Sequence, residues 1–159
     1  MAEDFSHMHK DGSVTMVDIG HKQESVRVAV AGAVVEMNEA TLELLKRAAL
    51  PKGDVLTTAK IAGIMAAKRT SELIPLCHPV ALDYVDIRFE IHETPPRILV
   101  EAEARCTGRT GVEMEALVAA QMATAAIYDM CKAVQKDIRI TDVRLLRKSG
   151  GKSGEFTAQ

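Results

Sequence analysis

Residues 111–136 read GVEMEALVAAQMATAAIYDMCKAVQK, and this pattern predicts a long helix that carries charged groups only near its two ends. From Ala116 to Tyr128 no side chain ionises near neutral pH. We therefore expect the middle of the helix to be buried. The groups that flank it should be partly desolvated as well, and desolvated acids and bases are where shifted pKa values are found.

Four flanking residues are the first candidates for chemistry: Glu113 and Glu115 near the start of the helix, Asp129 and Lys132 near its end. Asp129 and Lys132 are three residues apart, which places them on one helix face and lets them pair. The alternative is an ordinary surface ion pair, which contributes little to stability. The two glutamates also have a simpler interpretation, because acidic side chains in the first turn favourably oppose the helix dipole.

The length of this helix places Glu113 and Glu115 far from Asp129 and Lys132. Glu115 and Asp129 are fourteen residues apart, about 21 Å along an α-helix that rises 1.5 Å per residue. A single small-molecule site can hardly use both side chains from one chain. If both act on one substrate, the site is shared between subunits, so we expect a homo-oligomer with its active site at a subunit interface.

The segments on either side of the helix are predicted strands. Residues 82–92 and 97–106 each alternate apolar with polar side chains, and the turn sequence ETPP at 93–96 joins them, which indicates a β-hairpin. After the helix, residues 138–146 form another predicted strand. Its apolar phase slips at residues 141–142, which indicates a β-bulge.

Farther upstream, the sequence predicts one more strand and a helix. Residues 26–36 are rich in valine and alanine, and Gly32 is a candidate bulge position. Asn38 can cap a helix over residues 39–49, which Pro51 would end because proline lacks the backbone N–H.

A second helix begins at its predicted cap, Asp54, and extends to about Thr70. It has a face of small or apolar side chains suited to close packing, with another subunit as one candidate partner. The residues of this face are Leu56, Ala59, Gly63 and Ala66.

The predicted order is strand, two helices, strand, strand, helix, strand. This order is typical of an α+β, ferredoxin-like fold with a four-stranded antiparallel sheet and helices on one face. We expect an N-terminal arm over residues 1–24, a single catalytic α+β domain over 25–148 and a flexible tail rich in glycine and lysine over 149–159.

Composition narrows the classes of protein. A chain of 159 residues can bury a core without a disulfide or metal. The net charge of −2 argues against nucleic acid or an anionic membrane as partner. The three cysteines have no C-x-x-C spacing and indicate reduced thiols. The N-terminus lacks the features of a signal peptide and no run is suited to span a bilayer, so we expect a cytoplasmic protein.

The loop LIPLCHP at residues 73–79 presents His78 between two prolines, and a rigid loop suits a functional histidine. A purely structural histidine is the alternative. Cys77 and His78 are neighbours in sequence, and adjacent side chains rarely bind one ion together. No second Cys or His stands at zinc spacing, so we expect no metal site.

Two further segments are suited to anions. The loop TGRTG at 107–111 leads into the N-terminus of the long helix, where free N–H groups favour negative charge. The tail sequence RKSGGKSG at 147–154 is no P-loop, because Leu146 stands where the first glycine is required and no helix follows. It can still wrap a phosphate through N–H groups and lysine charge, or be a disordered polar tail.

Seven motifs along the chain, taken together, resemble the MoaC family, the cyclic pyranopterin monophosphate synthases of molybdenum-cofactor biosynthesis. The resemblance covers nearly the whole chain. The motifs are MVD (16–18), KGDV (52–55), AKIAGI (59–64), IPLCHP (74–79), TGVEMEAL (110–117), IYDMCKA (127–133) and KSGGKSG (148–154).

The resemblance implies a reaction. The substrate would be 3',8-cyclo-7,8-dihydroguanosine 5'-triphosphate, rearranged to cyclic pyranopterin monophosphate with release of pyrophosphate. It implies no redox cofactor and leaves open whether Mg²⁺ accompanies the triphosphate. It also implies a homohexamer built as a trimer of dimers, in agreement with the shared site inferred above.

The resemblance also implies residue roles. Asp129 and Lys132 would be the catalytic pair. From the chemistry of the reaction we hypothesise that Lys132 acts as general acid or base, held in place by Asp129, which also shuttles a proton. Burial would lower the pKa of Lys132 while Asp129 would raise it. The implied substrate-binding residues are Leu76, Cys77, His78, Glu113, Met114, Glu115, Lys52, Lys68, Arg27 and Lys148.

Three other classes of function are alternatives, and one of them, a metal enzyme built on His7, His9, His21, His78 and Cys77, is unsupported by the spacing of these residues. A non-catalytic effector-binding domain of the same fold would need an anion pocket but no paired Asp129 and Lys132. An RNA-recognition module would display aromatic side chains on its sheet, and residues 97–106 contain none.

Overall fold

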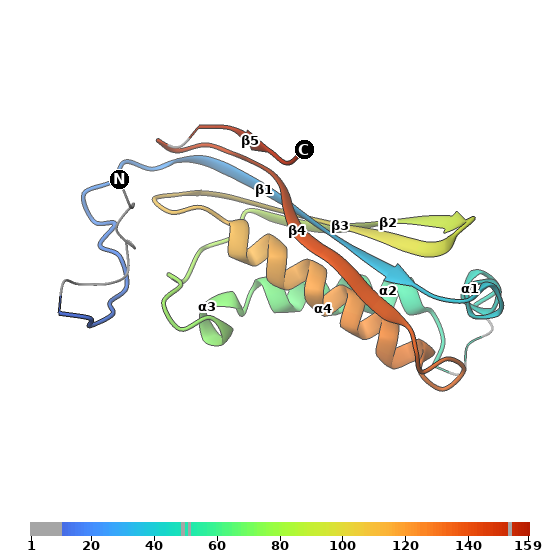
Figure 1. Ribbon diagram of the computed structural model, residues 1–159. Helices are drawn as coiled ribbons and strands as arrows, with labels where there is room; N and C mark the ends of the chain where they lie inside the picture. Colours follow the sequence, from blue (N-terminus) through green and yellow to red (C-terminus); the bar gives the residue numbers. More distant parts are fainter. Residues whose placement is uncertain (1–10, 49, 51, 153) are drawn as a thin grey trace.

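The computed structural model describes residues 11–48, 50, 52–152 and 154–159. One sheet forms the upper layer in Figure 1, and the helices pack below it. In chain order the elements are β1 (Ser25–Glu36), α1 (Glu39–Lys46), α2 (Val55–Ala67), α3 (Thr70–Leu73), β2 (Tyr84–Glu93), β3 (Pro96–Gly108), α4 (Glu113–Cys131), β4 (Arg139–Ser149) and β5 (Phe156–Thr157).

The strands form one sheet in the order β2-β3-β1-β4-β5, and every neighbouring pair is antiparallel. The first four strands and the helices between them have the connectivity of the ferredoxin-like fold, as predicted. The fifth strand is additional. It lies within residues 149–159 and pairs with Arg147 and Lys148 of β4.

The core lies between the sheet and two antiparallel helices, α2 and α4 (Figure 1). The inner face of the sheet has small side chains where it meets α4, including Ala31, Ala102 and Ala104, all 0% exposed. Gly63 of α2 lies against α4, since an added Cβ there would be 2.8 Å from the backbone oxygen of Ala119. The small-residue face of α2 therefore packs within the chain, and the idea that it meets another subunit was wrong.

Two helix boundaries differ from the prediction. Asn38 caps α1 as expected, its side chain accepting from the Thr41 N–H at 2.8 Å, but the helix ends at Lys46. Ala48 follows in a left-handed conformation, which stops the helix before it reaches the proline. The predicted end residues 49 and 51 lie outside the described residues.

The second predicted helix also ends early. Asp54 caps α2, accepting from the Thr57 N–H at 3.0 Å, and α2 stops at Ala67. A separate single turn, α3, then begins at Thr70. This break directs the chain into the loop that carries His78.

The prediction for α4 was correct for one face of its middle and for one end, while Met122 on the other face is 41% exposed. Ala116, Ala119, Ala120, Ala123 and Ile127 are fully buried, and Glu115 beside them is only 4% exposed. At the other end the expected desolvation was wrong. The Asp129 and Lys132 side chains are 53% and 50% exposed in the single chain, because they lie on the outward side of α4, whereas Met130 and Cys131 beside them are buried.

The predicted bulge in the last strand is confirmed. The β1–β4 register shifts between Gly32 and Val34, opposite residues 141–144, and Asp142 adopts a positive φ of 50°. A second shift lies between Val30 and Ala31. The extra residues are on β4, while Gly32 of β1 leaves room for the Leu146 side chain above it.

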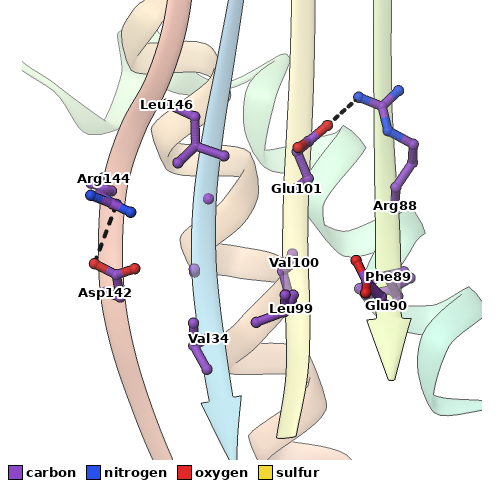
Figure 2. Close-up of a pocket in the computed structure, with 12 residues that line it drawn as sticks. Val34, Arg88, Phe89, Glu90, Leu99, Val100, Glu101, Asp142, Arg144 and Leu146 are labelled. Atoms are coloured by element: carbon purple, nitrogen blue, oxygen red, sulfur yellow. Dashed lines mark hydrogen bonds and ion pairs between the residues drawn. The ribbon is translucent and has the colours of Figure 1, made fainter. Parts of the chain in front are cut away.

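The outer face of the sheet carries a shallow hollow of about 440 Å³ (Figure 2). Its charged groups pair with one another: Arg88 lies 2.5 Å from Glu101, and Arg144 lies 3.3 Å from Asp142. Beside the hollow, Glu103 is buried, held by Arg88 at 3.0 Å and Arg105 at 2.6 Å. Burial acts to raise the Glu103 pKa, but these arginines lower it overall. None of the predicted site residues lines this hollow.

None of the helices among the described residues is long and apolar enough to cross a membrane.

Candidate active site

The N-terminal end of α4 faces a cavity of about 250 Å³, which we call the carboxylate cavity. It brings together residues from the His78 loop and the first turn of α4. All six predicted members from these two segments line it: Leu76, Cys77, His78, Glu113, Met114 and Glu115. Residues nearly forty positions apart in sequence thus meet because α3 and its loop lie beside the start of α4.

His78 is oriented by the N-terminal segment. Its Nε2 lies 2.7 Å from the backbone oxygen of Val17. A carbonyl oxygen can only accept, so Nε2 is the protonated nitrogen and Nδ1 is the acceptor in the neutral ring. Val17 belongs to the MVD motif, and its backbone rather than its side chain contributes to the site.

Glu115 is the most buried acid at this end of the helix. Its burial raises the pKa of its carboxyl group, and the neighbouring charge of Glu113 adds to the shift. No cation pairs with Glu115 among the residues described. Such a carboxyl group holds its proton at a higher pH than usual and is suited to act as a general acid. Burial also raises the pKa of the Cys77 thiol, which disfavours a thiolate there.

A larger cavity of about 850 Å³ adjoins the first, and we call it the basic cavity. Thr110, Gly111 and Glu113 line both cavities. The basic cavity also contains a set of cationic or ionisable side chains from the arm, β1, the TGRTG loop and the tail: His21, Lys22, Arg27, Arg109 and Lys152.

Two predicted residues connect these cavities to the sheet. Arg27 on β1 donates from Nε to the Gly108 backbone oxygen at 2.9 Å, which leaves the rest of its guanidinium facing the basic cavity. Lys148 on β4 lies 2.9 Å from Glu113 Oε1. This ion pair fixes the carboxylate that separates the two cavities.

The C-terminal end of α4 carries a second cluster. Asp129 accepts from Lys132 Nζ at 2.7 Å and from Lys52 Nζ at 2.6 Å. Lys52 also donates to the Asp129 backbone oxygen at 3.0 Å. The predicted pair of Asp129 and Lys132 is therefore confirmed as a contact, and Lys52 makes it a triad with two cations on one carboxylate.

Of the two expected influences on the pKa of Lys132, contact with Asp129 outweighs burial. The hydrogen bond to Asp129 raises the pKa of Lys132, and burial contributes little because the side chain is exposed. Reciprocally, Lys132 and then Lys52 lower the pKa of Asp129 to about 2. At neutral pH Lys132 is therefore an ammonium group and Asp129 a carboxylate.

The two clusters lie at opposite ends of a 19-residue helix. Because α2 runs antiparallel to α4, it has Lys52 just before its start at one cluster and Lys68 just after its end toward the other. Lys68 is exposed, and no hydrogen bond or ion pair joins its side chain to another predicted site residue in the described part of the chain. Within a single chain the predicted residues thus lie in two separate clusters.

Some lining residues were not among the predicted site residues. His21 and Lys22 fall in the arm, where no periodic pattern marked them. Arg109 and Lys152 belong to the two segments that the sequence indicated as suited to anions. Within the described part of the chain, no three His, Cys, Asp or Glu side chains are grouped as metal ligands. His7 and His9 lie outside that part.

Comparison with known proteins agrees with the family resemblance found in the sequence. Residues 16–151 match the model of the MoaC family. A protein of Nitratidesulfovibrio vulgaris named cyclic pyranopterin monophosphate synthase is 70% identical over 155 residues, covering 98% of this chain and 96% of the relative. One of the same name from Desulfovibrio desulfuricans is 68% identical, covering 99% and 97%. With the fold and the motif residues in these places, the chain belongs to the MoaC family.

Proposed function

We propose that this protein is a lyase that converts 3',8-cyclo-7,8-dihydroguanosine 5'-triphosphate to cyclic pyranopterin monophosphate and pyrophosphate in molybdenum-cofactor biosynthesis. The observation that carries the proposal is the near full-length identity of 70% to a relative named for the product of this reaction. The geometry described above supports it independently, because acid, base and phosphate-binding groups lie together.

The residue types match the demands of the chemistry. Opening a purine-derived ring and closing a pyrazine ring moves several protons, which requires groups that donate and accept them. Expelling pyrophosphate requires cations around the growing charge. The carboxylate cavity supplies Glu113, Glu115 and His78, and the basic cavity beside it supplies Arg27 and Lys152.

The electrostatics support distinct roles for the two clusters. Lys132 is protonated at neutral pH and held by Asp129, so it acts as a general acid or as a fixed positive charge rather than as a resting base. Glu115, with its raised pKa, is the second proton donor. Glu113 and His78 Nδ1 are the acceptors on the same side.

We propose further that the site is completed by a second copy of the chain. Asp129 and Glu115 are about 21 Å apart along α4, too far for one ring system to contact both. Between them the outward surface of the helix pair exposes apolar side chains, with Ile61 53%, Met65 51% and Met122 41% exposed. Met122 lies midway between the clusters, so antiparallel packing of two copies across it would bring opposite ends together.

The assembly we propose is a homohexamer made of three such dimers, located in the cytoplasm, with neither nucleic acid nor membrane as partner. The reaction needs no resident metal or redox cofactor, and Mg²⁺ would accompany the triphosphate if it acts at all. Oligomer mass by light scattering tests the assembly, and unchanged turnover after chelation tests the metal independence.

The reaction is tested by incubating the purified protein with enzymatically prepared 3',8-cyclo-7,8-dihydroguanosine triphosphate. We expect pyrophosphate and a pterin product in equal amounts, and neither product from GTP under the same conditions. Absence of turnover by a folded, oligomeric protein would contradict the proposal. Tight binding of the substrate without turnover would instead favour a non-catalytic effector-binding domain.

The shared site is tested by subunit exchange. Glu115→Ala and Asp129→Ala chains, each inactive alone, should regain about a quarter of the wild-type activity when mixed, because half the dimers are mixed and each restores one site. The matched control mixes Asp129→Ala with Lys132→Ala, which lie in the same cluster and should restore nothing. If exchange is verified and the first mixture stays inactive, the site is not shared in this way.

A further inference from the structure

We propose that two glycines, Gly111 and Gly151, are positioning residues whose missing side chains make room for the charged groups of Glu113 and Arg27. Both glycines line the basic cavity together with the side chains they accommodate. The inference rests on the proposed function, because it concerns how that site holds its acid and its cation.

At Gly111 the space of a side chain is occupied by the Glu113 carboxylate. An added Cβ would lie 1.8 Å from Glu113 Oε2, 2.6 Å from Cδ and 2.8 Å from Oε1, and no backbone atom is among its three nearest neighbours. A methyl group there would displace the carboxylate by about 1 Å or more before the contact became acceptable. The 2.9 Å pair between Glu113 and Lys148 could not survive unchanged.

At Gly151 the corresponding space is occupied by the Arg27 guanidinium. An added Cβ would lie 2.3 Å from Nη1, 3.0 Å from Cζ and 3.1 Å from Nη2. Arg27 is anchored on its other side, where Nε donates to the Gly108 oxygen at 2.9 Å. The tail backbone at Gly151 therefore packs against a fixed guanidinium and determines where its remaining N–H groups point.

Other glycines of the chain have a different role. Gly63 lies against Ile87 and the backbone of α4, and Gly150 would place a Cβ 2.2 Å from the Val26 backbone oxygen. Substitution there would move secondary-structure elements. At Gly111 and Gly151 the nearest atoms belong to the ends of flexible side chains, so a methyl group displaces the functional group while the fold is kept.

Gly111→Ala should lower kcat by about tenfold to a hundredfold, because a displacement near 1 Å removes a reacting group from its productive position. In a Glu113→Gln background the same change should have no further effect on kcat. The unfolding midpoint should stay the same or rise slightly, since alanine restricts the unfolded chain. An equal loss of kcat in both backgrounds would overturn the role assigned to Gly111.

Gly151→Ala should raise KM and the Kd of pyrophosphate by about tenfold with a smaller change in kcat, because it displaces a phosphate-binding cation. In an Arg27→Met background it should add nothing. Gly151 has a φ of 73°, so the control is Gly12→Ala, where φ is 84° and no atom lies within 4 Å. The control carries the same backbone strain and should leave KM unchanged. Unaltered pyrophosphate affinity in Gly151→Ala would overturn the role assigned to Gly151.

Two of these measurements do not depend on turnover, so they separate this inference from the proposed function. Pyrophosphate binding by calorimetry tests Gly151 even if the wild-type protein fails to convert the substrate. A crystal structure of Gly111→Ala tests Gly111 in the same way. A Glu113 carboxylate still 2.9 Å from Lys148 in that structure would overturn the inference, and its displacement would support it.

Discussion

The two ends of α4 hold carboxylates in opposite environments. At the N-terminal end Glu115 is 4% exposed, and its pKa is raised by burial. At the C-terminal end the Asp129 side chain is 53% exposed, and two lysines lower its pKa to about 2. One helix therefore carries one carboxyl group whose pKa is raised and another whose pKa is lowered.

The difference shows how one chain can hold a proton donor and a fixed charge in two separate places. Groups whose environments move their pKa values apart can serve as proton donor and as fixed charge at the same pH. Burial raises the pKa of Glu115, while direct contact with Lys52 and Lys132 lowers the pKa of Asp129. Variants that remove a charge from the Asp129 cluster, or the proton of Glu115, test this difference.

The largest effect is expected from Lys132→Ala, which should lower kcat/KM by about 10²- to 10⁴-fold if Lys132 donates a proton in the reaction. Lys132→Arg keeps the charge but cannot release a proton near neutral pH, so it should be nearly as inactive. Lys136→Ala is the matched control, an exposed lysine four residues farther along the chain and beyond the end of α4. Near-normal turnover by Lys132→Ala would remove Lys132 from the mechanism, whereas an active Lys132→Arg would assign it to charge alone.

An intermediate effect is expected from Glu115→Gln. We predict a loss of kcat of about tenfold to a hundredfold, together with loss of the decline in rate that follows deprotonation of Glu115 as pH rises. Stability gives a second readout. Since the folded-state pKa lies above the ordinary 4.5, the wild-type free energy of unfolding should fall as pH rises through that interval, and the variant should not show this. An unchanged pH–rate profile in the variant would assign proton donation to another group.

The smallest effect concerns Asp129 and acid stability. Its pKa lies at about 2 when folded against an ordinary 3.8, so its contribution to stability is complete above 3.8 and is lost as pH falls toward 2. Asp129→Asn should show a weaker decline in unfolding temperature over that range. Added salt should reduce the difference, since the triad is exposed. Identical acid titrations of the two proteins would contradict the low pKa.

Much of the fold followed from local pattern. The alternation in residues 82–92 and 97–106 and the apolar middle of residues 116–128 identified the hairpin and the long helix, because period 2 and period 3.6 decide which faces are buried. The predicted helix ends were less accurate. Ala48 and the break after Ala67 depend on backbone conformation at single residues, for which composition gives little indication.

The features of the site can be divided in the same way, into those that the sequence predicted and those that only the structure shows. The sequence by itself determined, through spacing on a helix, that Asp129 and Lys132 lie within pairing distance and that Glu115 lies too far away to join them in one chain, and its motifs resembled one family. Only the tertiary structure decided that Lys52 joins Asp129 from 77 positions away, that the Val17 backbone orients His78, and that Glu115 rather than Asp129 is desolvated. The physical reason is that pairing on a helix is local, whereas desolvation depends on which distant segments cover a side chain.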